Sequence, residues 1–384
     1  MNEADDVVVR AAESGREFRD FIALPYALHG ANPHWVPPLR IQQREALDTH
    51  KHPFWQYASR GLFVAYRDGR AVGRIAAIDN PVHNETFGEA STHFGFFECI
   101  DDDAVASALF AKVERFARER GHDLVRGPFN ASAVTGEIGL QIDHFDDPNF
   151  VMIPYSPSHY RRLVERQGFE KDVDLYCYMI DRANAPDWLL KRGERMVDTS
   201  RYRFRKVTKA SVKVDAGRIW QVYNSAWEKN WLWTKSTQAE FMHLVGELVQ
   251  IADFDMVWIA ENEEGEVIGF AIAIPNVNEA IIRVRDGRLL PFGLPKLLWG
   301  TRPGAIRTRR VLAMGVLEPY RKKGIHWSLI YKLAVECLRK GITLAEMSQI
   351  LETNTDMVKV AEFAGGWRSK THRMFVKRLS SGAA

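Results

Sequence analysis

The feature that most restricts the fold of this chain is a repeated order of sequence patterns, present once in each half of its 384 residues. In the first half, the β-rich runs 62–66 and 71–78 flank the turn RDGR. In the second half, 256–260 and 267–274 flank ENEEGE. Apolar, β-branched runs around a glycine turn predict β-hairpins. A strand and then a helix follow each hairpin, so the order predicts two copies of one α/β unit; the alternative is a coincidence within an ordinary α+β protein.

Helices are predicted where apolar residues recur at helical spacing. The helix that follows the third strand is expected over 104–120 in the first half, before Gly121, and over 325–340 in the second half, before Gly341. Two more helices, at 219–227 and 238–250, precede the second hairpin.

The length of the chain favours two domains. We expect an N-terminal domain over 1–182, a polar linker over 183–200, and a C-terminal domain over 201–384. In the C-terminal domain, 344–350 would form the strand after the helix, and 374–377 would close the sheet.

Positive charge is concentrated in one segment of the chain. The formal net charge is only +3, yet 283–323 holds eleven Lys or Arg and two acidic residues, so the remainder is net negative. This distribution argues against a nucleic-acid binder. It favours one specific anionic partner: a phosphorylated cofactor, an anionic membrane face, or both.

The three cysteines, Cys99, Cys177 and Cys337, are too widely spaced for a disulfide framework or a metal knuckle. We therefore expect a reduced, cytoplasmic setting and no metal site. The first residues, MNEADDVVVR, lack the flank and apolar core of a signal peptide, and no run approaches the ~18 apolar residues of a spanning helix. Any contact with the inner membrane face is expected to be peripheral.

Residues 310–338 carry the strongest chemical signal. An apolar strand, 311–317, meets Pro319, and a basic loop with Gly324 leads into an amphipathic helix. A glycine permits close backbone approach, and the free N–H groups at a helix start point at an anion. The order therefore predicts a pyrophosphate site, although a basic turn that caps a surface helix would share the pattern.

This segment resembles the GNAT acyltransferase superfamily, whose loop Arg/Gln-x-x-Gly-x-Gly/Ala holds the pyrophosphate of coenzyme A. Arg321 and Gly324 match, whereas His326 replaces the small residue. The resemblance implies an α/β (α+β) fold of two GNAT-like domains. Each would have a mixed, mostly antiparallel sheet flanked by helices, and central strands that splay to admit the pantetheine arm. The expected acyl-CoA site comprises Met314, Gly315, Val316, Leu317, Arg321, Lys322, Lys323, Gly324, Ile325, His326 and Asn354.

Several roles within this site stay open. Asn354 stands where the superfamily often places an Asn near the thioester, but Asn is equally common as a helix N-cap. The Tyr that usually protonates the departing thiolate is replaced by Glu362, so the general acid is unassigned. Glu352, after the predicted fifth strand, is the first candidate for a catalytic base, unless it is a solvated surface Glu. His326 is the alternative base.

The first half has acids, 101–103, where the second has its basic loop, and these would repel pyrophosphate while capping a helix. We therefore expect this half to shape the acceptor site instead. Its loop-like stretch 127–160 is of the kind that often carries function. The candidates for binding the acceptor there are Asn130, Glu137, Asp143 and Tyr155. Ordinary turn formation is the alternative for each.

Nearly the whole chain resembles the bacterial ceramide synthase-like family. The resemblance rests on the doubled half and on four segments: HWVPPL at 34–39, FGFFE at 94–98, GPFN at 127–130 and LETN at 351–354. The resemblance implies transfer of a long acyl chain from acyl-CoA to the amine of a sphingoid base. Two alternatives remain: an acetyltransferase for a small polar amine or peptide, and a non-catalytic acyl-CoA-binding, membrane-associated protein.

Residues 289–299, LLPFGLPKLLW, are apolar and flanked by arginines. Such a segment suits the interface of an anionic membrane, as a docking element or the mouth of an acyl channel. The alternative is that its apolar side chains are buried between the two halves.

Overall fold

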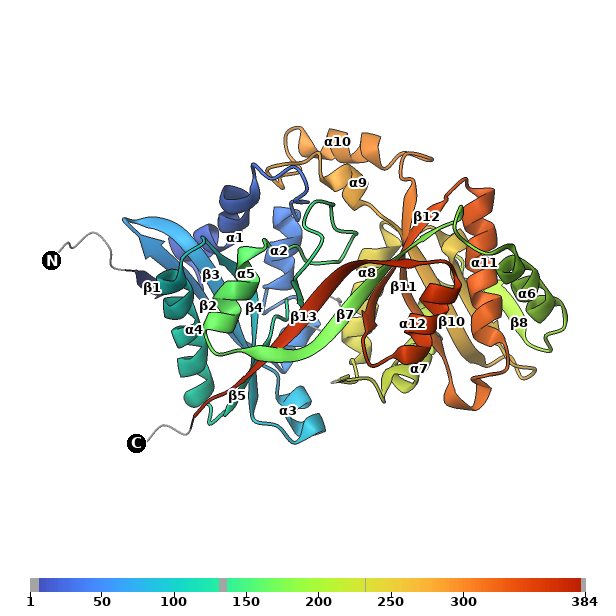
Figure 1. Cartoon of the computed structure of the whole chain (residues 1–384), viewed down its shortest axis with the longest axis horizontal. Coiled ribbons are helices and arrows are strands. Elements are labelled where there is room, and N and C mark those ends of the chain that lie inside the picture. Colours follow the sequence, from blue (N-terminus) through green and yellow to red (C-terminus); the bar gives the residue numbers. More distant parts are fainter. Residues whose placement is uncertain (1–6, 131–136, 232, 381–384) are drawn as a thin grey trace. The chain divides into compact units, whose positions relative to one another are not determined.

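A computed structural model describes residues 7–130, 137–231 and 233–380 of the chain (Figure 1). Its contacts define two compact units that interleave along the sequence. Unit 1 comprises the chain up to Leu175, Ala280–Trp299 and the residues from Lys370 onward; unit 2 comprises Tyr176–Glu279 and Gly300–Ser369. In the part of the chain that the structure describes, no helix is both long and apolar enough to cross a bilayer.

Unit 1 contains a mixed sheet in the order β1-β2-β3-β4-β5-β13-β7. All its neighbouring pairs with a defined register are antiparallel except β4 and β5. The strands are β1 Val8–Ala11, β2 Ser59–Arg67, β3 Arg70–Asp79, β4 Ser91–Cys99, β5 Leu124–Gly127, β13 Trp367–Arg378 and β7 Glu170–Asp181, with the short β6 Leu140–Gln141 beside β13. The helices are α1 Gly15–His29, α2 Arg40–Ala46, α3 Pro81–Phe87, α4 Asp103–Arg118, α5 His159–Arg166 and α10 Gly293–Gly300, with η2 Pro53–Gln56.

Two apolar clusters cover the two faces of the unit 1 sheet. The helix predicted over 104–120 from its apolar spacing is confirmed as α4, and its residues Val105, Leu109 and Val113 are fully buried in one cluster. On the other face, Phe21 and Ile22 of α1 pack with alternate residues of β2 and β3. The period of 3.6 in the helices and of 2 in the strands therefore decides which side chains form this core.

Unit 2 repeats the arrangement, with the order β13-β7-β12-β11-β10-β9-β8. Helices α7 and α8 cover one face of its sheet and α11 covers the other. Its further strands are β8 Arg203–Lys206, β9 Val257–Glu261, β10 Val267–Pro275, β11 Thr308–Val316 and β12 Leu344–Leu351. Its helices are α6 Asp187–Asp198, α7 Val212–Trp227, α8 Gln238–Val249, α11 Ile325–Arg339 and α12 Thr355–Phe363, with η4 Phe254–Met256 and η5 Glu318–Tyr320; α9 Asn278–Ile281 spans the boundary with unit 1.

The two units share strands β7 and β13, which the sequence had not indicated. The expectation that 374–377 closes the sheet of the second half is wrong, because Phe375–Arg378 pair with β5 of the first half. Within the predicted linker 183–200 lies helix α6. The predicted domain boundary at this linker stays a prediction. The compact units do not divide there, because unit 1 also includes Ala280–Trp299 and the residues from Lys370 onward.

A buried network of charged side chains surrounds Glu98 in unit 1. One carboxylate oxygen lies 2.6 Å from Nε2 of His29 and accepts a hydrogen bond from the Tyr160 hydroxyl at 2.7 Å; the other lies 3.5 Å from the Arg74 guanidinium. Burial opposes the charge of Glu98, but His29 and Arg74 outweigh it, so the pKa of Glu98 is lowered. The carboxylate is therefore held ionised, and it balances the buried charge of Arg74.

Replacing Glu98 by Gln should lower the free energy of unfolding of unit 1 by about 3 kcal/mol, because a buried Arg74 then lacks its counter-charge. The contribution of Glu98 is complete above the ordinary Glu pKa of about 4.3 and is lost as the pH falls through its lowered value. Urea unfolding of both proteins between about pH 7 and pH 3 should therefore show a difference that shrinks on acidification. A difference that grows at low pH would contradict this account.

Candidate functional site

The candidate site begins where β11 and β12 part, in unit 2. The two strands pair in parallel only through Thr308–Val311 and Leu344–Met347, although both continue beyond this register. On its other side, β11 stays paired with β10 as far as Val316. Over the described residues, Met314–Val316 thus form an edge that faces away from β10 and that β12 no longer covers. An extended amide-containing ligand can add to such an edge as another strand would.

A basic loop follows this edge and leads into α11. The Arg321 guanidinium donates to the carbonyls of Val316 at 3.1 Å and Ala226 at 2.9 Å, so it fixes the loop to the end of β11. Lys322 and Lys323 are exposed. Of the three predicted basic residues, Arg321 therefore holds the loop in place, and Lys322 and Lys323 are exposed to solvent.

Gly324 is the N-cap of α11 and has a φ of +84°, which a residue with a Cβ rarely adopts. A Cβ at this position would lie 2.8 Å from Sδ of Met196 in α6. The N-cap makes no side-chain hydrogen bond to the first turn of this helix. The first amides of α11 lack acceptors within the helix, and together with Lys322 and Lys323 they provide the electrostatics of an anion site.

His326 lies in the first turn of α11, half-buried. Burial lowers the pKa of His326, and the nearby Arg192 of α6 lowers it further against the opposing charge of Asp356. The imidazole is therefore neutral at neutral pH, as a general base requires. Its ring also stands 5.1 Å from that of Trp327, so packing holds it in place.

Glu352 follows β12 directly and is half-buried, as the sequence predicted for its position at the strand end. The Tyr176 hydroxyl of β7 donates to its carboxylate at 3.4 Å. Two residues further along β7, the Tyr178 hydroxyl donates to Glu362 at 3.2 Å. A phenol thus lies beside Glu362, the position where the superfamily usually has a Tyr.

The Asn354 side chain accepts a hydrogen bond from the backbone N–H of Met357 at 3.3 Å and caps α12. Of the two interpretations of Asn354, the structure shows the cap. The cap uses only the oxygen of the side chain. A contact between its amide nitrogen and the thioester stays a prediction.

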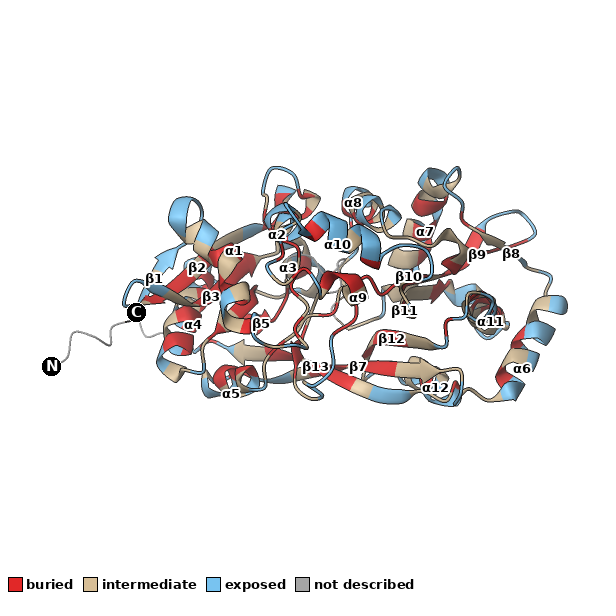
Figure 2. Ribbon diagram, turned by 90° about the horizontal axis from the view of Figure 1, so that it is seen from above, coloured by how far each residue is buried: buried red, intermediate tan, exposed pale blue. Residues whose placement is uncertain are grey.

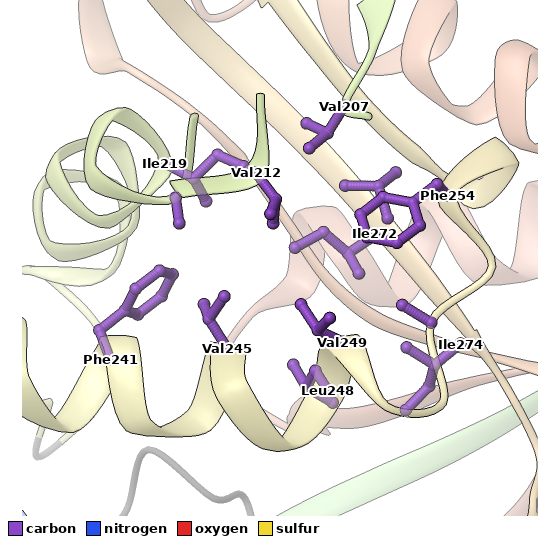
Figure 3. A pocket seen from close by; sticks show the side chains of 13 residues that line it. Val207, Val212, Ile219, Phe241, Val245, Leu248, Val249, Phe254, Ile272 and Ile274 are labelled. Atoms are coloured by element: carbon purple, nitrogen blue, oxygen red, sulfur yellow. The ribbon is translucent and has the colours of Figure 1, made fainter. Parts of the chain in front are cut away.

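An apolar pocket of about 60 Å³ lies under α7 and α8 of unit 2 (Figure 3). Ile272 in its wall pairs with Ala313 of β11, next to the edge at Met314. All of its lining residues are apolar: Val207, Val212, Ala216, Ile219, Phe241, Val245, Leu248, Val249, Ala252, Phe254, Val257, Ile272 and Ile274. Such a lining suits hydrocarbon and offers nothing to a polar group.

The corresponding strand edge of unit 1 is filled by the chain itself. Strands β4 and β5 are again parallel, but Phe129 donates its N–H to the Phe94 carbonyl at 2.8 Å, and the Phe96 N–H donates to the side chain of Asn130. The approach is so close that a Cβ at Gly95 would stand 1.6 Å from the Phe129 carbonyl oxygen. The predicted helix cap is confirmed, since Asp102 accepts from two amides of α4. These contacts occupy the strand edge of unit 1, while the expectation that the first half binds no CoA stays a prediction.

The four predicted acceptor-binding residues lie in unit 1, and each has a partner there. Asn130 holds Phe96, and the Glu137 carbonyl accepts from the Asn130 N–H. Asp143 accepts from the Thr371 N–H at 2.6 Å, and Tyr155 accepts from Asn32. These contacts show how the loop is held, while a role in acceptor binding stays a prediction. Residues 131–136 of this loop lie outside the described part of the chain.

Comparison with known proteins identifies relatives along the whole chain. It is 34% identical over 379 residues to the bacterial ceramide synthase of Caulobacter vibrioides (strain NA1000 / CB15N). The match covers 97% of this chain and 98% of the relative. This chain belongs to the bacterial ceramide synthase family. It is also 32% identical to protein YghO of Escherichia coli (strain K12), over 97% of this chain and 95% of the relative. No model of a known protein family matches the sequence.

Solved structures show the fold of this member of the family. A tandem GNAT protein from the clavulanic acid biosynthesis pathway matches with a TM-score of 0.56 and 12% identity, over 98% of this chain and 99% of that one. A GCN5-related glucosamine N-acetyltransferase region in a fungal β-N-acetylglucosaminidase also gives 0.56, with 14% identity, over 97% of this chain and 38% of that one. The predicted pair of GNAT-like units is confirmed, and this family member is an acyltransferase.

Sequence reasoning missed three residues that touch the candidate site: Tyr176, Arg192 and Met196. Arg192 and Met196 were overlooked because 183–200 was interpreted as a linker. The apolar spacing of Leu189, Leu190 and Met196 could have shown the helix. Nothing in the sequence indicated Tyr176, because its partner Glu352 lies 176 residues away.

Proposed function

We propose that this chain transfers a long acyl group from acyl-CoA to the primary amine of a sphingoid base. The observation that carries the proposal is the strand edge at Met314–Val316, which β12 leaves unpaired and where Arg321 binds the Val316 carbonyl. It lies next to the cationic loop and the first turn of α11. An edge of this kind suits the two amides of pantetheine, and the loop suits a pyrophosphate. The contrast with unit 1, whose edge is filled by Phe129 and Asn130, supports a single donor site.

The proposed reaction is a direct attack of the amine on the thioester. Glu352, directly or through a water, takes a proton from the ammonium group. The amine nitrogen then bonds to the thioester carbon and the carbon–sulfur bond breaks. The nitrogen loses its second proton, which passes through solvent to the departing thiolate. The products are an amide and coenzyme A. Its thiol has a reference pKa of ~8.5 and is a fair leaving group. Burial raises the pKa of Cys337, the cysteine of α11, to about 11, so this thiol is a poor nucleophile.

The name of the Caulobacter relative supports the lipid amine as acceptor. The apolar lining of the unit 2 pocket supports a hydrocarbon group as its ligand. Its volume of about 60 Å³ is smaller than the about 150 Å³ of an engineered cavity that binds benzene, so it suits the end of one chain. Because both substrates are amphiphiles that partition into lipid, the proposed place of reaction is the cytoplasmic face of the membrane.

A thiol-release assay tests the proposal. Purified protein is incubated with palmitoyl-CoA or acetyl-CoA, together with 3-oxosphinganine or a polyamine, and free thiol is followed. Release only with the long chain and the lipid amine is the expected result. Release with acetyl-CoA and the polyamine would instead support an acetyltransferase, and binding of CoA without release would support a non-catalytic protein.

Filling the pocket should shorten the preferred acyl chain. Val245→Phe adds a ring inside the pocket, so the rate with palmitoyl-CoA should fall about tenfold while that with hexanoyl-CoA stays near the wild-type value. Val214→Phe is the matched control, because Val214 is an exposed residue of α7 outside the pocket lining. Equal loss for both chain lengths would show that the pocket does not hold the acyl chain.

A further inference from the structure

The residues between β10 and β11 include the apolar stretch 289–299, which together with Arg288 we call the docking segment. It ends in α10, whose residues are mostly exposed in Figure 2. Four large side chains of the segment are more than half exposed: Leu290 at 74%, Phe292 at 72%, Leu298 at 63% and Trp299 at 65%. A single exposed apolar residue is ordinary, but a cluster of this size marks an interaction surface.

The residues just before the docking segment are bound to the connection between α1 and α2 and to the start of α2, in the same unit. The Arg285 guanidinium donates to the carbonyls of Trp35 at 2.7 Å and Gly30 at 2.9 Å. Arg40 donates its N–H to the Gly287 carbonyl at 2.9 Å and its Nε to the Asp286 carbonyl at 2.8 Å. The exposed residues that follow are therefore presented from an anchored base, and their exposure does not come from a loose loop.

The charge around the docking segment has a single sign. From Gly287 to Leu317 the sequence contains no Asp or Glu. Arg288 and Lys296 within the segment are exposed, as are Arg302 and Arg307 just after it. Cations beside exposed Leu, Phe and Trp are the combination that binds an anionic bilayer, with the rings at the headgroup level and the cations at the phosphates.

We propose that the docking segment binds the surface of an anionic lipid bilayer. A second copy of the chain is a poorer occupant, because a two-fold symmetric contact would set the same cations opposite one another. Only the purpose of this binding rests on the proposed function: it would bring the enzyme to a substrate that lies in the membrane. The binding itself can be measured without catalysis.

Vesicle flotation tests the proposal with the full chain. Wild-type protein should bind vesicles of phosphatidylcholine with about 30% phosphatidylglycerol and bind pure phosphatidylcholine far more weakly. The double variant Phe292→Ser/Trp299→Ser should bind the anionic vesicles at least about tenfold more weakly. Arg288→Gln/Lys296→Gln should lose affinity and much of its salt dependence. Phe363→Ser is the matched control, since Phe363 is a similarly exposed aromatic residue on α12, and it should bind as wild type.

Two outcomes overturn the proposal: equal binding of the wild type and the Phe292/Trp299 variant, and failure of the wild type to bind anionic vesicles. If light scattering also shows that the wild type is a dimer and the variant a monomer, the segment is a contact between copies. Acyl transfer measured in detergent micelles separates this test from the proposed function. The variant should keep the wild-type rate there and lose rate only on vesicles. A wild type inactive in micelles contradicts the function and leaves the vesicle result standing.

Discussion

Glu352→Gln is expected to lower the turnover number about 10²- to 10⁴-fold while changing the affinity for CoA by less than about twofold. The amide keeps the size of the side chain and can still accept a hydrogen bond from Tyr176, but it cannot take the proton that the attacking ammonium must lose. Single-turnover rates with saturating acyl-CoA, together with calorimetric titration of CoA, measure the two quantities separately. Raising the pH should partly restore the rate, because more of the amine is then already neutral.

Glu362→Gln is the matched control for this experiment. Its carboxylate also accepts from a tyrosine of β7, at a similar distance, but it lies at the end of α12 and not at the strand end. It should keep a near-wild-type rate. An undiminished rate for Glu352→Gln would remove Glu352 as the base and leave His326. Since burial lowers the pKa of His326, a rate that depends on its neutral form would persist below about pH 6.5.

Gly324→Val is expected to weaken CoA binding about 100-fold. Valine at a φ of +84° is strained, and its Cβ would lie 2.8 Å from Met196, so the loop must move away from the start of α11. The backbone N–H groups at the start of α11 then no longer point together at the pyrophosphate. Titration calorimetry with CoA measures the loss.

Gly341→Val separates the loss of the site from general destabilisation. Gly341 also has a positive φ, of +67°, and a Cβ there would meet nothing within 4 Å. Its valine variant should be strained to a similar degree and melt at a lower temperature, yet bind CoA as wild type does. Equal loss of CoA affinity in both variants would show that the binding defect comes from strain alone.

The elements around the candidate site were predictable because their signals are local. The strand before the loop, Gly324 and the helix after it lie within about thirty residues, and the sequence placed α11 to within one residue at its end. The helix cap at Asp102 and the position of Glu352 after β12 follow from equally short patterns. The role of Arg321 could not be predicted, because the carbonyls that it binds depend on the folded backbone. For Asn354 the sequence offered the helix cap as one of two roles, and the structure shows the cap.

The sequence by itself determined the two hairpins, the helix faces and the cationic loop, because each depends on spacing along a short piece of chain. Only the tertiary structure decided that β7 and β13 are shared by both units, that Tyr176 meets Glu352, and that unit 1 covers its own strand edge. The physical reason is that a strand pattern specifies which side chains face the core and leaves the neighbouring strand undetermined. Likewise, the sequence shows that 289–299 is apolar but not whether its side chains are buried. Only the fold shows that most of its large side chains are exposed.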